Sequence, residues 1–175
     1  MRSALILAAS LVMLISTTAA ATNSADSCLA LTARALTFMR DRHLQNVRIA
    51  LVRDPTREES AQEAEEIHAS LSQGTAFADM HLTVLDISID KIESANDIDV
   101  FWITKGMKGE YGRVASVANK QHALSVSSDL DCAQQGLCVL GVQAEPSVKI
   151  ILSANAASEA GISFQPAFRM MVTER

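Results

Sequence analysis

The cysteine pair Cys132 and Cys138 is the part of the sequence with the clearest capacity for chemistry. It stands in the stretch DCAQQGLCVLGVQ, residues 131–143, where a polar loop runs into an apolar segment. Two such cysteines can form a metal clip, a redox pair or a structural crosslink. A redox pair has the tighter CxxC spacing beside a helix N-terminus. Zinc needs further ligands, and the histidines stand singly, at His43, His68, His81 and His122. We therefore expect no metal site.

A second candidate site is the loop TKGMKGEYGR, which follows the apolar run DVFWIT. Open α/β sheets place their ligand crevices beyond the carboxyl ends of strands. The cations of this loop suit an anion at the N-terminus of the next helix. A tyrosine expected to be exposed and an adaptable methionine are typical of protein interfaces. The residues expected to contact a partner or ligand are Lys105, Met107, Lys108, Tyr111 and Arg113. A mobile surface loop is the alternative, because GxGxxG and Walker patterns are absent here.

Side chains for catalysis are present but do not form a convincing set. Ser127, Ser128, Asp129 and Asp131 supply hydroxyls and carboxylates, but no GxSxG elbow presents a nucleophile. His122 precedes a strand, where it is read as a surface residue. We therefore expect no catalytic residue, no enzymatic activity and no cofactor.

The N-terminus has the pattern of a secretory signal. Residues 1–21 combine a basic Arg2, an apolar run and small residues suited to cleavage near Ala20 or Ala21. The apolar run is shorter than the roughly 20 residues that a bilayer core requires. Cleavage leaves residues 22–175 as one domain, which we expect in the periplasm without membrane insertion. The chain has 20 acidic and 15 basic residues, which argues against nucleic-acid binding.

An oxidising compartment favours one reading of the cysteine pair. Exported proteins retain disulfides, so Cys132 and Cys138 are predicted to form a local crosslink. Cys28 is then the odd thiol, either free or paired with a second chain.

The order of apolar runs predicts an α/β fold. Strands are expected at Val47–Val52, His81–Ser88, Asp99–Thr104 and Ala123–Asp129, alternating with helical segments. This alternation is typical of a parallel sheet with helices on both sides. The final pair, CVLGVQ and VKIILS, is joined by AEPS, which is too short for a parallel crossover. We therefore predict a three-layer α/β/α domain, with a mostly parallel sheet and an antiparallel C-terminal hairpin.

Helical spacing also predicts which side chains are buried. In EESAQEAEEIHASLSQG, Glu63, Glu65 and Glu66 are expected to face solvent. Trp102 and the pair Met170 and Met171 are expected in the core. In the closing segment, Gly161 is expected to stop a short helix, while Ser163 caps a second one with Pro166 in its first turn.

In the order of its elements, nearly all of residues 22–175 resembles the YfiR family of periplasmic proteins, with the residue-level matches between Asp99 and Val172. The resemblance is carried by DVFWIT, ALSVSSD, the Cys-bounded loop and VKIILSANAASEAGISFQPAFRMMV, in this order. Family members often end their first helix with an aromatic stretch running into Trp-Pro. This chain has FMRDRHLQN there and retains Phe38 alone, so contacts made by those aromatic residues are not expected to be shared.

The resemblance implies regulation by protein contact. Family members bind the periplasmic domain of an inner-membrane diguanylate cyclase and hold down cyclic-di-GMP synthesis, and an outer-membrane lipoprotein can relieve this inhibition. They carry stabilising disulfides and tend to form homodimers. Two other functions stay open. A small-solute-binding or sensor protein would hold a ligand near residues 105–113, and a periplasmic enzyme would place an acid or base in the same crevice.

Overall fold

The computed structural model describes residues 24–40, 45–72 and 80–175. The predicted signal, residues 1–21, lies outside these ranges, so its cleavage stays a prediction. The strands are β1 (Asn46–Arg53), β2 (His81–Ser88), β3 (Val100–Ile103), β4 (Leu124–Ser127), β5 (Leu140–Gln143), β6 (Lys149–Leu152) and β7 (Thr173–Glu174). The α-helices are α1 (Ser24–Leu36), α2 (Glu58–Ser72), α3 (Tyr111–Lys120), α4 (Leu130–Gln134), α5 (Ala154–Glu159) and α6 (Pro166–Met171), and two 3-10 helices are η1 (Ile89–Ser94) and η2 (Lys108–Glu110).

These strands form one sheet in the order β2-β1-β3-β4-β5-β6-β7. The neighbouring pairs β2–β1, β1–β3, β3–β4 and β4–β5 are parallel, whereas β5 and β6 form an antiparallel pair. The predicted fold class is thereby confirmed, including the C-terminal hairpin. The short strand β7 was not expected from the sequence. It pairs in parallel with β6 and returns the end of the chain to the sheet.

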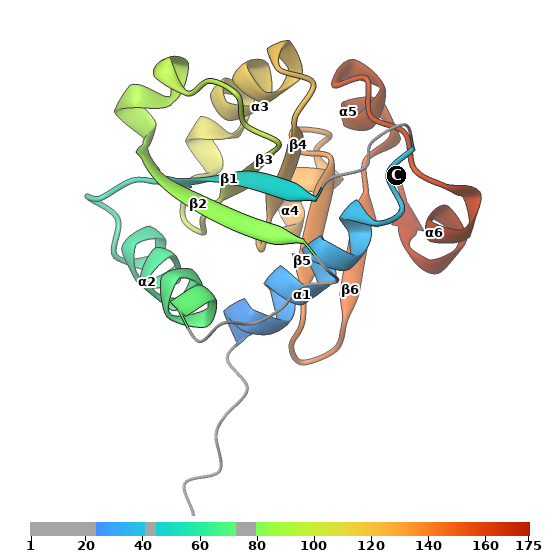
Figure 1. The fold of residues 1–175 in the computed structure, drawn as a ribbon, viewed down its shortest axis with the longest axis horizontal. Coiled ribbons are helices and arrows are strands. Elements are labelled where there is room, and N and C mark those ends of the chain that lie inside the picture. The colour runs from blue at the N-terminus through green and yellow to red at the C-terminus, as the bar shows by residue number, and fades with distance from the viewer. Residues whose placement is uncertain (1–23, 41–44, 73–79) are drawn as a thin grey trace, which may run out of the picture.

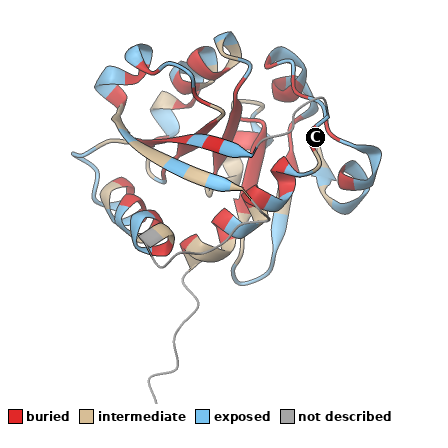
Figure 2. Ribbon diagram, viewed as in Figure 1, coloured by how far each residue is buried: buried red, intermediate tan, exposed pale blue. Residues whose placement is uncertain are grey.

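Alternate residues of each central strand enter two separate cores, because successive side chains in a strand point to opposite faces. Ile49 and Leu51 of β1 belong to the core under α1 and α2, while Ala50 and Val52 belong to the core under η1 and α3. Figure 1 shows α1 and α2 on one side of the sheet and α3 on the other. In Figure 2, the central strands are almost wholly buried. Trp102 lies in the first core, as predicted.

The cysteine loop begins with the short helix α4, which the sequence pattern did not predict. Asp129 accepts a hydrogen bond from the Asp131 amide at its start. The predicted disulfide joins Cys132 of α4 to Cys138, just before β5, and both cysteines are buried. The crosslink therefore holds α4 against the strand that follows it. Cys28 is free and buried in α1, where burial raises the pKa of its thiol.

The last helix differs from its prediction. Pro166 stands in its first turn as expected, but Gln165 rather than Ser163 is the residue at its N-cap. Met170 and Met171 are 84% and 62% exposed, so their predicted place in the core is wrong. The helix has six residues, and Phe168 is its buried member, stacked between Phe38 and Phe164. Both methionines lie in the last turn of this helix, and Met170, two positions after Phe168, points away from the face that Phe168 buries.

Gly141 of β5 allows α4 to pack directly on the sheet. A Cβ atom at this position would lie 3.2 Å from both the Ala133 Cβ atom and the Leu130 Cα atom. Replacing Gly141 by Ala should therefore lower the free energy of unfolding by about 1–3 kcal/mol through overpacking. Urea denaturation measures this change. Gly112→Ala is the matched control, since a Cβ there has open space within α3 and should stabilise the helix. Equal effects of the two substitutions would contradict this packing.

Candidate functional site

A cleft of about 750 Å³ opens at the carboxyl ends of the parallel strands. From β1 the chain crosses to β2 on one side and then returns to β3 on the other. Such a reversal in strand order splays the connecting loops apart and leaves a crevice above the strand ends. Helix α2 forms one wall with Glu59, Gln62, Glu63 and Glu66. The loops after β3 and β4 form the other with residues that include Lys105, Gly106, Lys108, Ser128 and Asp129.

The buried carboxylate of Glu63 joins the two walls of this cleft. Glu63 is 4% exposed, on the buried face of α2. One of its oxygens accepts hydrogen bonds from Ser128 Oγ at 2.5 Å and Trp102 Nε1 at 3.3 Å. The other accepts the Lys105 backbone N–H at 2.6 Å. A single side chain of α2 therefore fixes the loops that follow β3 and β4. The expectation that Glu63 faces solvent is wrong.

Burial has a measurable electrostatic consequence at Glu63. Desolvation raises the pKa of its carboxyl group above the usual value for glutamate, and the donors from Ser128 and Lys105 offset part of this rise. An ionised carboxylate loses its hydration when it is buried, so the neutral form is favoured. The same carboxylate still accepts three hydrogen bonds, which satisfies the group within the fold.

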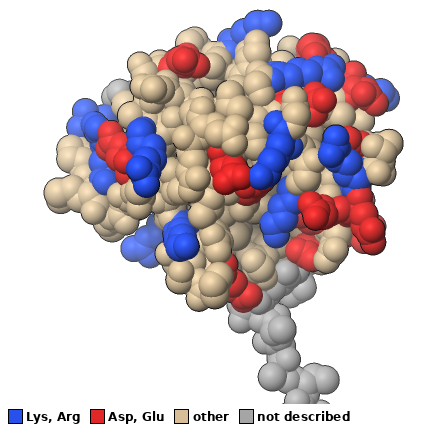
Figure 3. Space-filling view, turned by 180° about the vertical axis from the view of Figure 1, so that it is seen from behind, with Lys and Arg blue, Asp and Glu red and all other residues tan. Residues whose placement is uncertain are grey.

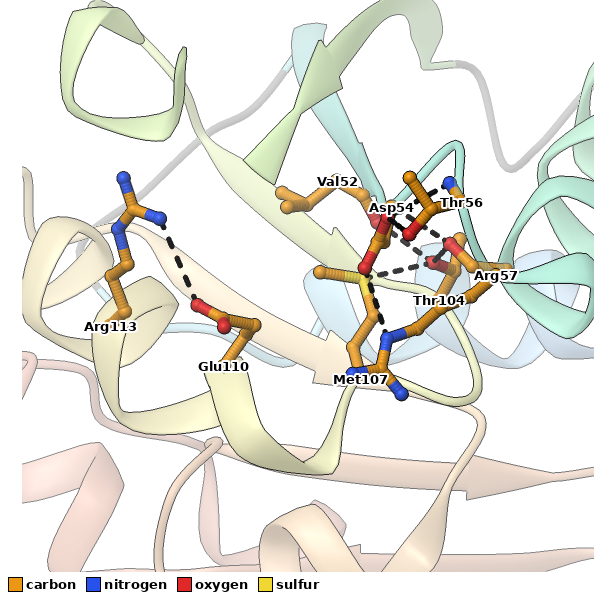
Figure 4. A network of polar contacts seen from close by, with 9 residues as sticks. Val52, Asp54, Thr56, Arg57, Thr104, Met107, Glu110 and Arg113 are labelled. Atoms are coloured by element: carbon orange, nitrogen blue, oxygen red, sulfur yellow. Dashed lines mark hydrogen bonds and ion pairs between the residues drawn. The ribbon is translucent and has the colours of Figure 1, made fainter. Parts of the chain in front are cut away.

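The turn between β1 and α2 supplies its own anion. Asp54 accepts hydrogen bonds from the Thr56 amide and hydroxyl, and Arg57 Nε donates to its other oxygen at 2.9 Å. These donors lower the pKa of Asp54, those from Thr56 most of all. Figure 4 shows this cluster at the end of β1, with Thr104 and Met107 beside it. Because Asp54 already stands before α2, and acidic residues fill its first turn, this end of the helix is unsuited to a phosphate.

A second polar cluster lies on the opposite wall. Lys108 Nζ lies 2.5 Å from Asp131 Oδ2 and 3.9 Å from Asp129 Oδ2. Tyr111 donates its hydroxyl hydrogen to Asp129 at 2.8 Å. Burial and this hydrogen bond raise the pKa of Tyr111. The cluster joins η2 and α3 to the start of α4, and so fixes the wall formed by these segments.

The structure separates the five residues that the sequence grouped as contacts. Lys105 and Lys108 line the cleft. Met107 and Tyr111 are fully buried under the loop, so the predicted exposure of Tyr111 is wrong and neither side chain is available to a partner. Arg113 pairs with Glu93 and Glu110 on another part of the surface, as Figure 4 shows for Glu110. The loop is therefore the edge of a cleft and the start of α3.

Sequence reasoning missed the α2 wall, although a signal for it exists. Buried residues of α2 include Ser60, Glu63, Ala64 and Ile67, which follow the spacing of one helical face. Glu63 therefore falls in the same stripe as Ala64 and Ile67. Its charge caused it to be assigned to solvent, since the donors that satisfy it come from distant strands.

The charged groups on one face of the molecule are mixed in sign. Figure 3 shows acidic and basic side chains lying next to one another, with no large area of one sign on that face. In the ranges 24–40, 45–72 and 80–175, no group of three or more His, Cys, Asp or Glu residues is arranged to hold a metal ion. No helix within those ranges combines the length and apolar character needed to cross a bilayer.

Comparisons with known proteins place the fold but not the family. No protein-family model and no curated protein matches the chain. An ABC domain from Streptococcus pneumoniae, described as a complex with L-Trp, is similar over 87% of this chain, with a TM-score of 0.59 and 13% identity. A conserved domain protein from Vibrio cholerae is similar over 86%, with a TM-score of 0.60 and 13% identity. This chain covers 60% and 59% of those chains.

At this identity the likeness shows a shared fold. Membership of the YfiR family stays a prediction, because no family model matches. The Cys132–Cys138 disulfide fits an oxidising compartment, as expected for an exported protein.

The raised pKa of Glu63 gives stability a defined dependence on pH. The folded state holds a proton on Glu63 at pH values where the unfolded chain has lost it. The stabilisation that this extra proton gives the folded state is fully present below the pKa of Glu63 in the unfolded chain. It is lost as pH rises through the pKa of Glu63 in the folded state. The difference in unfolding free energy between the wild type and Glu63→Gln should therefore fall as pH rises from 4 to 8. Urea denaturation at several pH values measures it.

A matched variant separates this effect from the other titrating groups. Glu65 is exposed on the same helix, so Glu65→Gln should leave the dependence on pH nearly unchanged. A wild-type stability that rises with pH relative to Glu63→Gln would contradict the assignment.

Proposed function

We propose that this chain is an exported binding domain that takes up a small polar solute in the cleft above β1, β3 and β4. The observation that carries the proposal is the cleft itself, which lies where the strand order reverses and has its two walls joined by Glu63. Small-molecule sites in open α/β sheets occur at this position.

The lining of the cleft suits binding better than turnover. Its described residues include no histidine and no cysteine. The hydroxyl of Ser128 donates to Glu63, and the Asp129 carboxylate accepts hydrogen bonds from Tyr111 and from the Asp131 amide. These groups hold the walls in place. The likeness to a domain that carries L-Trp supports the same class of function, since both chains share the fold.

A screen of solutes against the wild type and against a variant with a blocked cleft tests this proposal. The exported protein is heated with amino acids, amines, carboxylic acids, sugars and nucleosides, each in separate pools. A solute at about 100 times its Kd stabilises the folded state by about 2.7 kcal/mol, which raises Tm by several degrees. Gln62 is an exposed cleft residue, so Gln62→Trp should fill the cleft and abolish the shift.

The control variant carries the same side chain elsewhere on the helix. Glu65 is exposed and does not line the cleft, so Glu65→Trp should retain the shift. Absence of any shift across the pools, or a shift that persists in Gln62→Trp, would refute solute binding in this cleft.

A second candidate function is contact with a membrane diguanylate cyclase. It is favoured by the exposed methionines of α6, because Met170 and Met171 present apolar surface of the kind that protein partners cover. Under this proposal the periplasmic domain of the cyclase binds this surface, an outer-membrane lipoprotein competes for it, and the protein acts as a homodimer. These partners follow from the YfiR resemblance.

Deletion of the coding region should raise cellular cyclic-di-GMP under this second proposal. Complementation with the intact gene should reverse the rise, whereas Met170→Lys combined with Met171→Lys should not, provided that immunoblotting shows equal amounts of protein. Val148→Lys is the control, since Val148 is 64% exposed in a different segment. Unchanged cyclic-di-GMP on deletion would contradict the proposal.

A further inference from the structure

The charges of the cleft fall into two groups, those that are already paired and those that are not. Arg57 is paired with Asp54 at 2.9 Å, and Lys108 with Asp131 at 2.5 Å. Glu63 accepts its three hydrogen bonds. Glu66 accepts one from Gln62 Nε2 at 3.0 Å. The protein itself therefore satisfies these groups in part or in full.

Two opposite charges in the cleft have no such partner. Among residues 24–40, 45–72 and 80–175, the side chains of Lys105 and Glu59 make no ion pair and no hydrogen bond, and both residues are exposed. The contact of Lys105 with Glu63 uses its backbone N–H. Its ammonium group acts on Glu63 through charge attraction alone, which lowers the pKa of that carboxyl group.

The two unpaired groups lie close to the same peptide. Gly106 has a φ of +76°, and a Cβ atom built on it would lie 3.3 Å from Glu59 Oε2. The carboxylate of α2 therefore reaches over the loop directly beside Lys105. The two charges are nevertheless not within 4 Å of one another, since no ion pair joins them among the described residues. A cation and an anion thus line one cleft, each with free hydrogen-bonding capacity.

We propose that the solute is a small zwitterion, whose protonated amine is held by Glu59 and whose carboxylate is held by Lys105. This inference rests on the proposed function and names the class of molecule that fills the cleft. Charge-assisted hydrogen bonds at both ends would fix the orientation of the solute. A molecule that carries one charge satisfies one of these groups and leaves the other without a partner.

The other charges near the cleft argue against an anion as the ligand. Glu66 lies on the same wall as Glu59, and Asp54 stands before the first turn of α2. Carboxylates on this wall repel a phosphate or a dicarboxylate. The amine of a zwitterion is attracted to the same wall, so the whole helix favours the orientation that Glu59 sets.

Three pools of matched compounds test the inference by isothermal titration and thermal shift. The first pool holds the twenty common amino acids, the second their decarboxylated amines, and the third the carboxylic acids that lack the amino group. We expect binding from the first pool, with the matched amine and acid each weaker by about tenfold or more, as the loss of one charged hydrogen bond implies.

Two substitutions assign the ends of the solute. Lys105→Met should remove the preference for the amino acid over the amine, and Glu59→Gln should remove its preference over the acid. Lys91→Met and Glu65→Gln are the controls, since both residues are exposed and neither lines the cleft. These controls should keep the affinity of the wild type. The assignment would be overturned if Lys105→Met lost the preference over the acid, or if Glu59→Gln lost the preference over the amine.

The outcomes separate this inference from the proposed function. If sugars, nucleosides, simple amines or simple acids bind in a manner that Gln62→Trp blocks, and amino acids do not, the cleft is a solute site but the zwitterion assignment is wrong. If no pool binds at all, solute binding itself fails. Binding of amino acids that is unaffected by both Lys105→Met and Glu59→Gln would also overturn the assignment.

Discussion

The buried carboxylate of Glu63 is the constraint on which the cleft depends. It joins α2 to Trp102 in β3, to the Lys105 amide just after that strand, and to Ser128 just after β4. Three segments that are distant in sequence are therefore fixed by one side chain. The desolvation that raises its pKa is a cost of this arrangement, and the three donors offset part of it.

The sheet provides the frame that makes this contact possible. Alternation along β1 and β3 fills two cores, so the strands are held from both faces and their carboxyl ends are fixed in space. Helix α4 extends this frame to the far wall, where Gly141 and the Cys132–Cys138 disulfide hold it against β5. The cleft is therefore a rigid surface between fixed elements. A solute that binds there meets groups already in position, which lowers the entropic cost of binding.

Much of this frame could be predicted from the sequence, because apolar runs and short connections reflect local physics. The limits of β2 and the antiparallel pair at the C-terminus follow directly from such patterns. The site was less predictable. Tyr111 begins the buried stripe of α3 with Val114 and Ala118, so the position where the helix begins decides its burial. The burial of Glu63 depends on hydrogen-bond donors in β3 and in the loops after β3 and β4, and no local sequence pattern contains this information.

Amide hydrogen exchange at Lys105 tests the role of Glu63 most directly. This N–H lies in a loop beyond the end of β3, where exchange would ordinarily be fast, but it donates to a buried carboxylate at 2.6 Å. The account predicts protection that approaches that of the β3 amides in the wild type and is lost in Glu63→Ala. Fast exchange of this amide in the wild type, or equal protection in the variant, would contradict it.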